Sequence, residues 1–285
     1  MNSHGITARA GLAPFDLYPY NPSKSAGWAF VVIFGICAAF HFVYMFPLRA
    51  WFFVPFILGC VGEAFGYYGR AWSHNNIRLG SPYLLQLMLI LGSAPLLAAT
   101  VYMTLGRFVR SLRAEKHTIM RSTWVTKIYV LIDVASFICQ MMGSAMQGSG
   151  DLKGVELGQH IVIGGLIVQL VALAWFLIEC TVLHRRLHKR PTFVSRNPSV
   201  QWQRTLWTLH FVTLLIFGRS LYRLIEFLDG SEGYLATHEA YLYAFDASLL
   251  SIAALLLALV HPGRLFTLVR KLDLCEFEDG AVLLD

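Results

Sequence analysis

Charged side chains lie inside several long apolar stretches of this 285-residue sequence. Placing one ionised group in hydrocarbon costs a few kcal/mol even on lenient scales, so such groups pair with one another or face a polar cavity. The chemistry that they favour is the binding of a charged or polar ligand within a membrane. The residues concerned are Glu63, Arg70, Asp133, Arg219, Arg223, Glu226 and Asp246.

Two of these stretches carry their charges at helical spacing. Glu63 and Arg70 are seven residues apart and share one helix face, as do Arg219, Arg223 and Glu226 at positions i, i+4 and i+7. Both stretches are expected to cross the membrane in the same direction, and the order of acid and base is reversed between them. We therefore expect Glu63 to lie near Arg219, and Arg70 to lie near Glu226.

Other polar residues extend this candidate site. Asp246, in the last apolar stretch, lies close to the depth of Arg219 at about 1.5 Å per residue. If this site binds a cation, depth makes Glu63 and Asp246 the carboxylates expected to meet it, with Arg219 as the internal counter-charge. The structural alternative is a set of static ion pairs that hold the helices in register. Three more side chains continue the polar lining: Asp133, Gln140 and Gln169.

The composition indicates an all-α membrane protein. The chain is 56% hydrophobic and 14% charged, whereas about a quarter of the residues in soluble domains are charged. About 20 apolar residues suffice for a helix to cross the membrane, and the sequence predicts a bundle of seven transmembrane helices near 28–47, 52–71, 83–106, 126–147, 160–183, 205–227 and 240–261. We expect residues 1–27 to be an extracellular segment, 28–262 the transmembrane domain and 263–285 a cytoplasmic tail.

The basic residues fall into alternate loops, which predicts the orientation of the chain. Sixteen Lys and Arg residues lie on one predicted side, mostly within 107–127 and 185–204, and four lie on the other. The richer side is expected to be cytoplasmic, with the N-terminus outside and the C-terminus inside. The net charge of +6 thus reflects orientation and indicates no nucleic-acid partner. Residues 264–272 have one apolar and one basic face, which predicts a short helix lying in the membrane interface.

The sequence shows no motif for covalent catalysis, and we expect neither an enzyme nor a bound cofactor. No Lys lies in the interior of a predicted span, which excludes a retinal Schiff base. His74, His160 and His238 lie near the outer ends of spans and could in principle hold zinc for a lipid hydrolase. No two of them have ligand spacing on one helix, so no metal site is expected. Small residues predict close helix packing at Gly143, Gly148, Gly164 and Gly165.

At these positions the chain resembles the fungal RTA1-like proteins, also called the lipid-translocating exporter family. The resemblance rests on an ordered set of short blocks that extends over about residues 20–262. The run Gly143-Ser-Ala departs from the consecutive glycines expected there. The blocks are YNPS at 20–23, EAFGYYGR at 63–70, DVASFICQ at 133–140, GGLIVQ at 164–169, RSLYRLIE at 219–226 and HEAYLYAFD at 238–246.

The resemblance implies a fungal seven-helix membrane protein that exports or flips lipids or cationic amphiphiles, such as sphingoid bases or sterol-like compounds. It also implies resistance to toxic amphiphiles, and a role in porphyrin transport has been proposed for the family. Membrane lipids or amphiphilic small molecules would be the partners, and the plasma membrane is favoured over an internal membrane. The alternative function is a heptahelical receptor or lipid sensor, although the Asp-Arg-Tyr and Asn-Pro-x-x-Tyr motifs of rhodopsin-like receptors are missing.

The charge asymmetry makes the topology testable. A tag at the N-terminus should be accessible to protease in intact cells, and a tag at the C-terminus should be protected, because the basic loops stay in the cytoplasm. A protected N-terminal tag would overturn this orientation.

Overall fold

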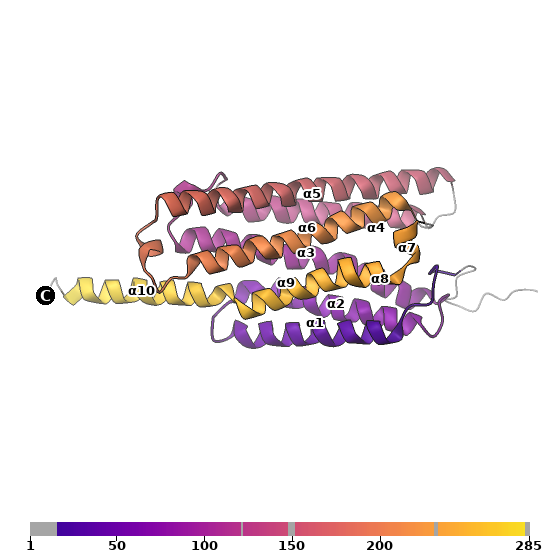
Figure 1. The fold of residues 1–285 in the computed structure, drawn as a ribbon, viewed down its shortest axis with the longest axis horizontal. Coiled ribbons are helices and arrows are strands. Elements are labelled where there is room, and N and C mark those ends of the chain that lie inside the picture. The colour runs from indigo at the N-terminus through magenta and orange to yellow at the C-terminus, as the bar shows by residue number, and fades with distance from the viewer. Residues whose placement is uncertain (1–15, 121, 148–151, 231–232, 283–285) are drawn as a thin grey trace, which may run out of the picture.

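The structure is a computed structural model that describes residues 16–120, 122–147, 152–230 and 233–282. These residues form helices and no strand. Helices α1 to α6 and the α8–α9 segment lie side by side in an elongated bundle (Figure 1). The helices are α1 (Lys24–Met45), α2 (Val54–Ser73), α3 (Gly80–Ser111), α4 (Ser122–Gln147), α5 (Leu152–Lys189), α6 (Trp202–Asp229), α7 (Tyr234–Thr237), α8 (Glu239–Leu242), α9 (Ser248–Leu259) and α10 (Pro262–Val282), with a π-helical turn (Tyr243–Ala247) between α8 and α9.

The described part of the chain contains six helical segments that are long and apolar enough to cross a membrane. They correspond to α1, α2, α3, α4, α5 and the segment from α8 into α10. Helix α6 has the required length, 28 residues, but it lies outside this set and carries Arg219, Arg223 and Glu226. The structure thus supports an all-helical, multi-pass membrane protein, while the count of seven spans stays a prediction.

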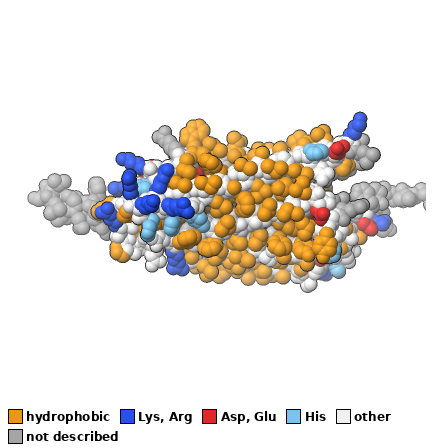
Figure 2. Space-filling view, turned by 45° about the horizontal axis from the view of Figure 1, so that its top comes forward, with side chains coloured by type: hydrophobic (Ala, Val, Ile, Leu, Met, Phe, Trp, Pro, Cys, Tyr) orange, Lys and Arg blue, Asp and Glu red, His pale blue; other side chains and the backbone are white. Residues whose placement is uncertain are grey.

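The surface of the bundle separates apolar from basic residues. Figure 2 shows hydrophobic side chains over the middle of the molecule and Lys and Arg gathered at the end from which α10 emerges. We call this the basic end; it comprises the α1–α2 connection, the start of α10 and residues 107–116 and 185–204. The N-terminal segment 16–23 and α7 lie at the opposite end (Figure 1). The apolar middle is the surface that hydrocarbon would cover.

The C-terminal helix differs from the expected short interfacial helix over 264–272. Helix α10 is 21 residues long and continues along the long axis of the bundle beyond its basic end (Figure 1). The expectation was wrong because the apolar face of this helix finds protein to cover it. Leu265 and Val269 are buried, and the Phe266 ring lies 5.8 Å from that of Phe52.

Helix α2 approaches α3 closely through a stripe of glycines that the sequence analysis did not single out. A Cβ atom at Gly59 would lie 2.9 Å from the Leu97 side chain, and one at Gly66 would lie 2.6 Å from that of Ile90. Small residues allow such close contact between helices in a membrane, where dispersion forces drive association. Gly59 and Gly66 flank Glu63, so this contact fixes the position of that carboxylate in the bundle.

Of the four glycines predicted to pack closely, the structure places two at the α4–α5 contact. A Cβ atom at Gly143 would lie 2.5 Å from the Gly158 carbonyl oxygen, and one at Gly165 would lie 3.0 Å from the Cβ of Cys139. The prediction was wrong for Gly164, where an added Cβ atom would meet no neighbouring heavy atom within 4 Å. Gly148 lies outside the described residues.

Gly143 and Gly164 therefore form a matched pair for a packing test. Gly143→Ala should lower stability by about 1–3 kcal/mol, because the new methyl group would meet backbone that cannot rotate away. Gly164→Ala should leave stability unchanged or raise it, since alanine favours a helix by up to about 1 kcal/mol over glycine. Melting temperatures of the detergent-purified variants measure both effects, and equal melting temperatures would contradict the α4–α5 contact.

Candidate functional site

The centre of the candidate site is a carboxylate held by two arginines. Asp246 is completely buried and forms ion pairs with Arg219 through one oxygen and with Arg223 through the other. Arg219 also donates a hydrogen bond to the carbonyl oxygen of Ile90 in α3, at 3.2 Å. Asp246 therefore joins the last span to α6, and Arg219 links both to α3.

Asp246 lies in an irregular part of its helix. Residues Tyr243–Ala247 form a π-helical turn between α8 and α9, and the Ser248 hydroxyl donates to the Tyr243 carbonyl oxygen at 2.8 Å. A π turn contains one residue more than an α turn, so it changes the face on which neighbouring side chains project; such turns are frequent at functional sites. Regular helical spacing could not have revealed this feature.

Glu63 lies beside this group without joining it. Its side chain is completely buried, and neither carboxylate oxygen has a hydrogen-bond partner among the described residues. It is within electrostatic range of Arg219, Asp246 and Arg223. The expected neighbourhood of Glu63 and Arg219 is thus present, but the ion pair of Arg219 is with Asp246, because the last span packs against α6 and brings its acid closer.

The expected pairing of Arg70 with Glu226 was wrong. Arg70 forms an ion pair with Glu239 at 3.0 Å, and its Nε also donates to the Tyr243 hydroxyl at 3.2 Å. Glu226 instead pairs at 3.0 Å with Arg223, three residues earlier on its own helix. The charge order is reversed between the two helices, as expected, but Arg70 and Glu226 each pair with a different residue that lies closer.

Residues 16–23 close the end of the bundle over Arg70. The Arg70 guanidinium donates to the Tyr20 hydroxyl at 2.6 Å, and the Ser23 N–H donates to the two Glu239 oxygens at 2.9 and 3.0 Å. Tyr18 donates from its hydroxyl to the Gln86 side chain at 3.0 Å. Burial raises the pKa of Tyr18, which precedes the first span, to about 12, so this hydroxyl keeps its proton at neutral pH.

The remaining residues of the predicted lining lie on the other side of α6. A small cavity of about 10 Å³ is lined by Gln140, Gln169, Arg219 and Arg223 among others, and this volume is close to that of one water molecule. Asp133 is buried near the Tyr102 hydroxyl and the Gln169 side chain, and neither of its carboxylate oxygens has a partner at hydrogen-bond geometry among the described residues. Gln140 of α4 and Gln169 of α5 thus line the same cavity as the arginines of α6. The sequence predicted that these residues share a polar interior.

A larger hollow reaches Arg223 from the end opposite the basic end. It has a volume of about 340 Å³, and its walls combine polar and apolar side chains, including Gln159, Arg223, Glu226, Phe227 and Ala236. Arg223 lines both this hollow and the small inner cavity. The Arg223–Glu226 pair therefore stands between an accessible hollow and the buried Asp246.

One buried acid lies outside the set of charged residues predicted from the sequence. Glu179 in α5 is completely buried and accepts hydrogen bonds from the Met120 N–H at 3.1 Å and from the Tyr129 hydroxyl at 3.4 Å. Its position within the apolar run WFLIECTVL was a signal of the same kind as those used for the other acids. These contacts give Glu179 a structural role, since it ties the α3–α4 connection to α5.

The three histidines near the span ends each contact a backbone carbonyl oxygen. His74 contacts Pro22, His160 contacts Glu156, and His238 contacts Tyr234. Among the residues that the structure describes, no three His, Cys, Asp or Glu side chains come together in a way that could hold a metal ion.

Comparison with known proteins assigns the family. The sequence pattern of RTA1-like proteins matches residues 56–268, a range that contains the whole charge cluster. The chain belongs to the RTA1-like protein family. It is accordingly a multi-pass membrane protein, in agreement with its apolar helices.

Several relatives come from Saccharomyces cerevisiae. Protein RTA1 is 30% identical over 273 residues, covering 87% of this chain and 85% of its own length. Protoporphyrin uptake protein 1 is 30% identical, covering 82% of this chain and 88% of its own length. Sphingoid long-chain base transporter RSB1 is 28% identical, covering 83% of this chain and 70% of its own length. No solved structure matches the chain.

The closure over Arg70 predicts a measurable change when Glu239 is neutralised. Glu239→Gln should speed amide hydrogen exchange in residues 16–23 by about ten- to a hundredfold, because the Ser23 N–H loses a charged acceptor worth about 1.5–3 kcal/mol. Glu156→Gln is the matched control, since Glu156 is an exposed acid in α5. Unchanged exchange in the Glu239 variant would show that the segment is held in another way.

Proposed function

We propose that this protein is a translocator that exports lipids or amphiphiles with a cationic head group, and that Glu63 binds the head group. The observation that carries the proposal is the completely buried Glu63 carboxyl, which has no hydrogen-bond partner among the described residues. An unpaired carboxylate in a low-dielectric interior is strongly destabilising. A residue of this kind is accounted for when a ligand supplies the missing partner.

The charges around Glu63 support a cationic ligand. Two arginines, Arg219 and Arg223, are in ion-pair contact with two acids, Asp246 and Glu226. Glu63 adds a third acid within electrostatic range of both arginines. The cluster therefore has one carboxylate more than it has guanidinium groups, and either a proton or a cationic head group can balance it.

The shape of the bundle suits a ligand with a small polar head. The hollow of about 340 Å³ beside Arg223 and Glu226 has room for a head group, and polar side chains continue from there toward Asp246. A long apolar tail needs no such space, because it can remain in hydrocarbon against the apolar surface of the bundle (Figure 2). Only the head group would have to cross the polar interior.

The names of relatives agree with this class of substrate. One relative is named as a transporter of sphingoid long-chain bases, and another is named for protoporphyrin uptake. A long-chain base combines an apolar chain with a basic group, which is the combination that Glu63 and the surrounding apolar surface would accept. In our proposal the protein lies in the plasma membrane, with seven spans and its N-terminus outside. Export of toxic amphiphiles by this protein would make the cell resistant to them.

Glu63 and Asp246 have different roles in this mechanism. Both oxygens of Asp246 are occupied by arginines, so this acid holds Arg219 and Arg223 in place. Glu63 is the carboxylate that is free to pair with an arriving cation. Arg219 lies within range of both acids and provides the counter-charge when the site contains no ligand.

This difference separates function from stability in two variants. Glu63→Gln should lower the flip rate of a fluorescent long-chain amine in proteoliposomes at least tenfold and leave the melting temperature unchanged or higher, because no arginine loses a hydrogen-bonded partner. Asp246→Asn should lower stability by about 3–5 kcal/mol, because Arg219 loses its ion-pair partner and Arg223 loses one of its two.

Glu156→Gln controls for the loss of one exposed acid and should flip the amine at the wild-type rate. Full transport by Glu63→Gln would refute the assigned role of Glu63. Amine binding without flip by the wild-type protein would refute translocation and favour a sensor.

A further inference from the structure

Four arginines surround one hollow at the basic end of the bundle. The hollow has a volume of about 360 Å³ and lies between the α1–α2 connection, the end of α3 and the start of α10. No acidic residue is among the described residues that line it. The guanidinium groups come from three separate segments, since they belong to Arg49, Arg107, Arg110 and Arg270.

Packing between α10 and the α1–α2 connection shapes this hollow. The Thr267 hydroxyl donates to the Leu48 carbonyl oxygen at 3.3 Å, and a Cβ atom at Gly263 would lie 3.1 Å from the Leu48 side chain. The Arg107 guanidinium lies 4.5 Å from the centre of the buried Phe52 ring. This cation–π contact holds one of the four charges at the wall of the hollow.

Arg49 occupies a backbone position that favours glycine. Its φ angle is 48°, and the Ala50 N–H bonds to the Met45 carbonyl oxygen at 2.9 Å in the manner of a helix C-terminal cap. Non-glycine residues in this left-handed conformation are destabilised by about 1–2 kcal/mol. Arginine at this position is therefore unfavourable for the turn itself, and its side chain lines the hollow.

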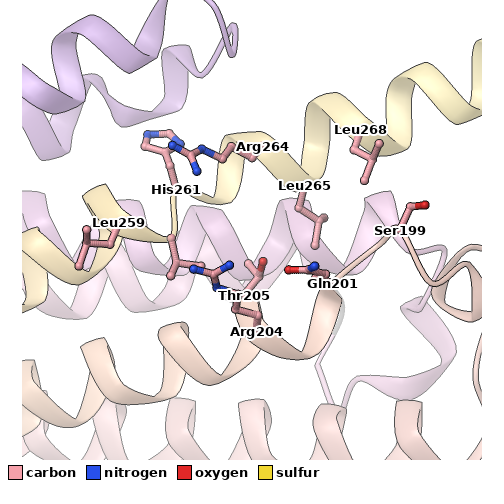
Figure 3. A pocket seen from close by; sticks show the side chains of 10 residues that line it. Ser199, Gln201, Arg204, Thr205, Leu259, His261, Arg264, Leu265 and Leu268 are labelled. Atoms are coloured by element: carbon pink, nitrogen blue, oxygen red, sulfur yellow. The ribbon is translucent and has the colours of Figure 1, made fainter.

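A second hollow at the same end differs in charge. It has a volume of about 140 Å³ and is lined by Arg204, Arg264 and His261, with leucines between them (Figure 3). Arg264 already lies over the Tyr44 ring, 5.4 Å from its centre, and donates to the Tyr44 hydroxyl at 3.4 Å. Of these two hollows, the one around Arg49 brings four arginines together, whereas the other brings two.

We propose that the hollow lined by Arg49, Arg107, Arg110 and Arg270 binds a phosphate-bearing group, either the head group of an anionic lipid or a soluble phosphate ester. Arginine presents planar pairs of donors that match phosphate oxygens. Basic pockets between transmembrane helices on the cytoplasmic side are suited to phosphorylated lipid head groups. The site is separate from Glu63 and does not depend on the proposed transport.

The probe is short-chain phosphatidylinositol 4-phosphate, and its affinity for the full-length protein in detergent is measured by native mass spectrometry. Arg49→Gly should weaken binding at least about tenfold, as expected for the loss of one charged hydrogen bond. Its melting temperature should equal or exceed that of the wild type, because glycine is favoured at this φ. Arg270→Gln should weaken binding in the same direction.

Arg113→Gly is the matched control. Arg113 is also an arginine with a positive φ, 52°, in the same kind of cap, but it does not line the hollow. Its variant loses the same charge and should bind the lipid at wild-type affinity. Equal weakening by both variants, or equal binding of phosphatidylcholine, would overturn the proposal and leave only a general surface attraction.

Inositol 1,4-bisphosphate distinguishes the two sources of phosphate. If it binds with the affinity of the lipid and depends on Arg49, the ligand is a soluble phosphate ester. If only the lipid binds, the ligand is an anionic lipid from the membrane leaflet that lies next to the basic end. Wild-type protein that binds neither compound would refute the site.

Discussion

Asp246 forms ion pairs with two arginines inside the bundle, and the arrangement of the surrounding helices depends on this contact. Without Asp246, Arg219 would lose its ion-pair partner and Arg223 would keep Glu226 alone, in the interior of a bundle whose outer surface is apolar. The contact holds α6 against the last span, and the hydrogen bond from Arg219 to Ile90 extends it to α3. Its strength comes from the low dielectric, which also makes an unpaired charge costly.

Glu63 differs from this balanced group in having no hydrogen-bond partner among the described residues. The glycines on either side of it bring α2 so close to α3 that the carboxyl is enclosed by the helix contact. The same packing that stabilises the bundle therefore leaves the Glu63 carboxyl available. Because the charges next to Glu63 are paired with one another, Glu63 can bind a cation without loss of the helix contacts.

The two ends of the molecule use arginine differently. At one end Arg70 is enclosed by Glu239, Tyr20 and Tyr243, so its charge holds the N-terminal segment over the bundle. At the basic end Arg49 and Arg270 line an open hollow that has no acid among its described lining residues. An enclosed, fully bonded guanidinium stabilises the fold, whereas exposed ones that line a hollow with no acid among its described residues leave a positive potential for an anion.

The sequence by itself determined the membrane class, the helical content and the charged residues of the polar interior other than Glu179, because apolar length and buried charge follow from local composition. It also placed Glu63, Arg219 and Asp246 at similar depths, since the rise of a helix is constant. Only the tertiary structure decided the partners: Arg70 pairs with Glu239 and not with Glu226, and a π-helical turn presents Asp246 to α6. Rotation and lateral contact of helices depend on close packing, as at Gly66 and Ile90, and helical spacing within one segment contains no information about its neighbours.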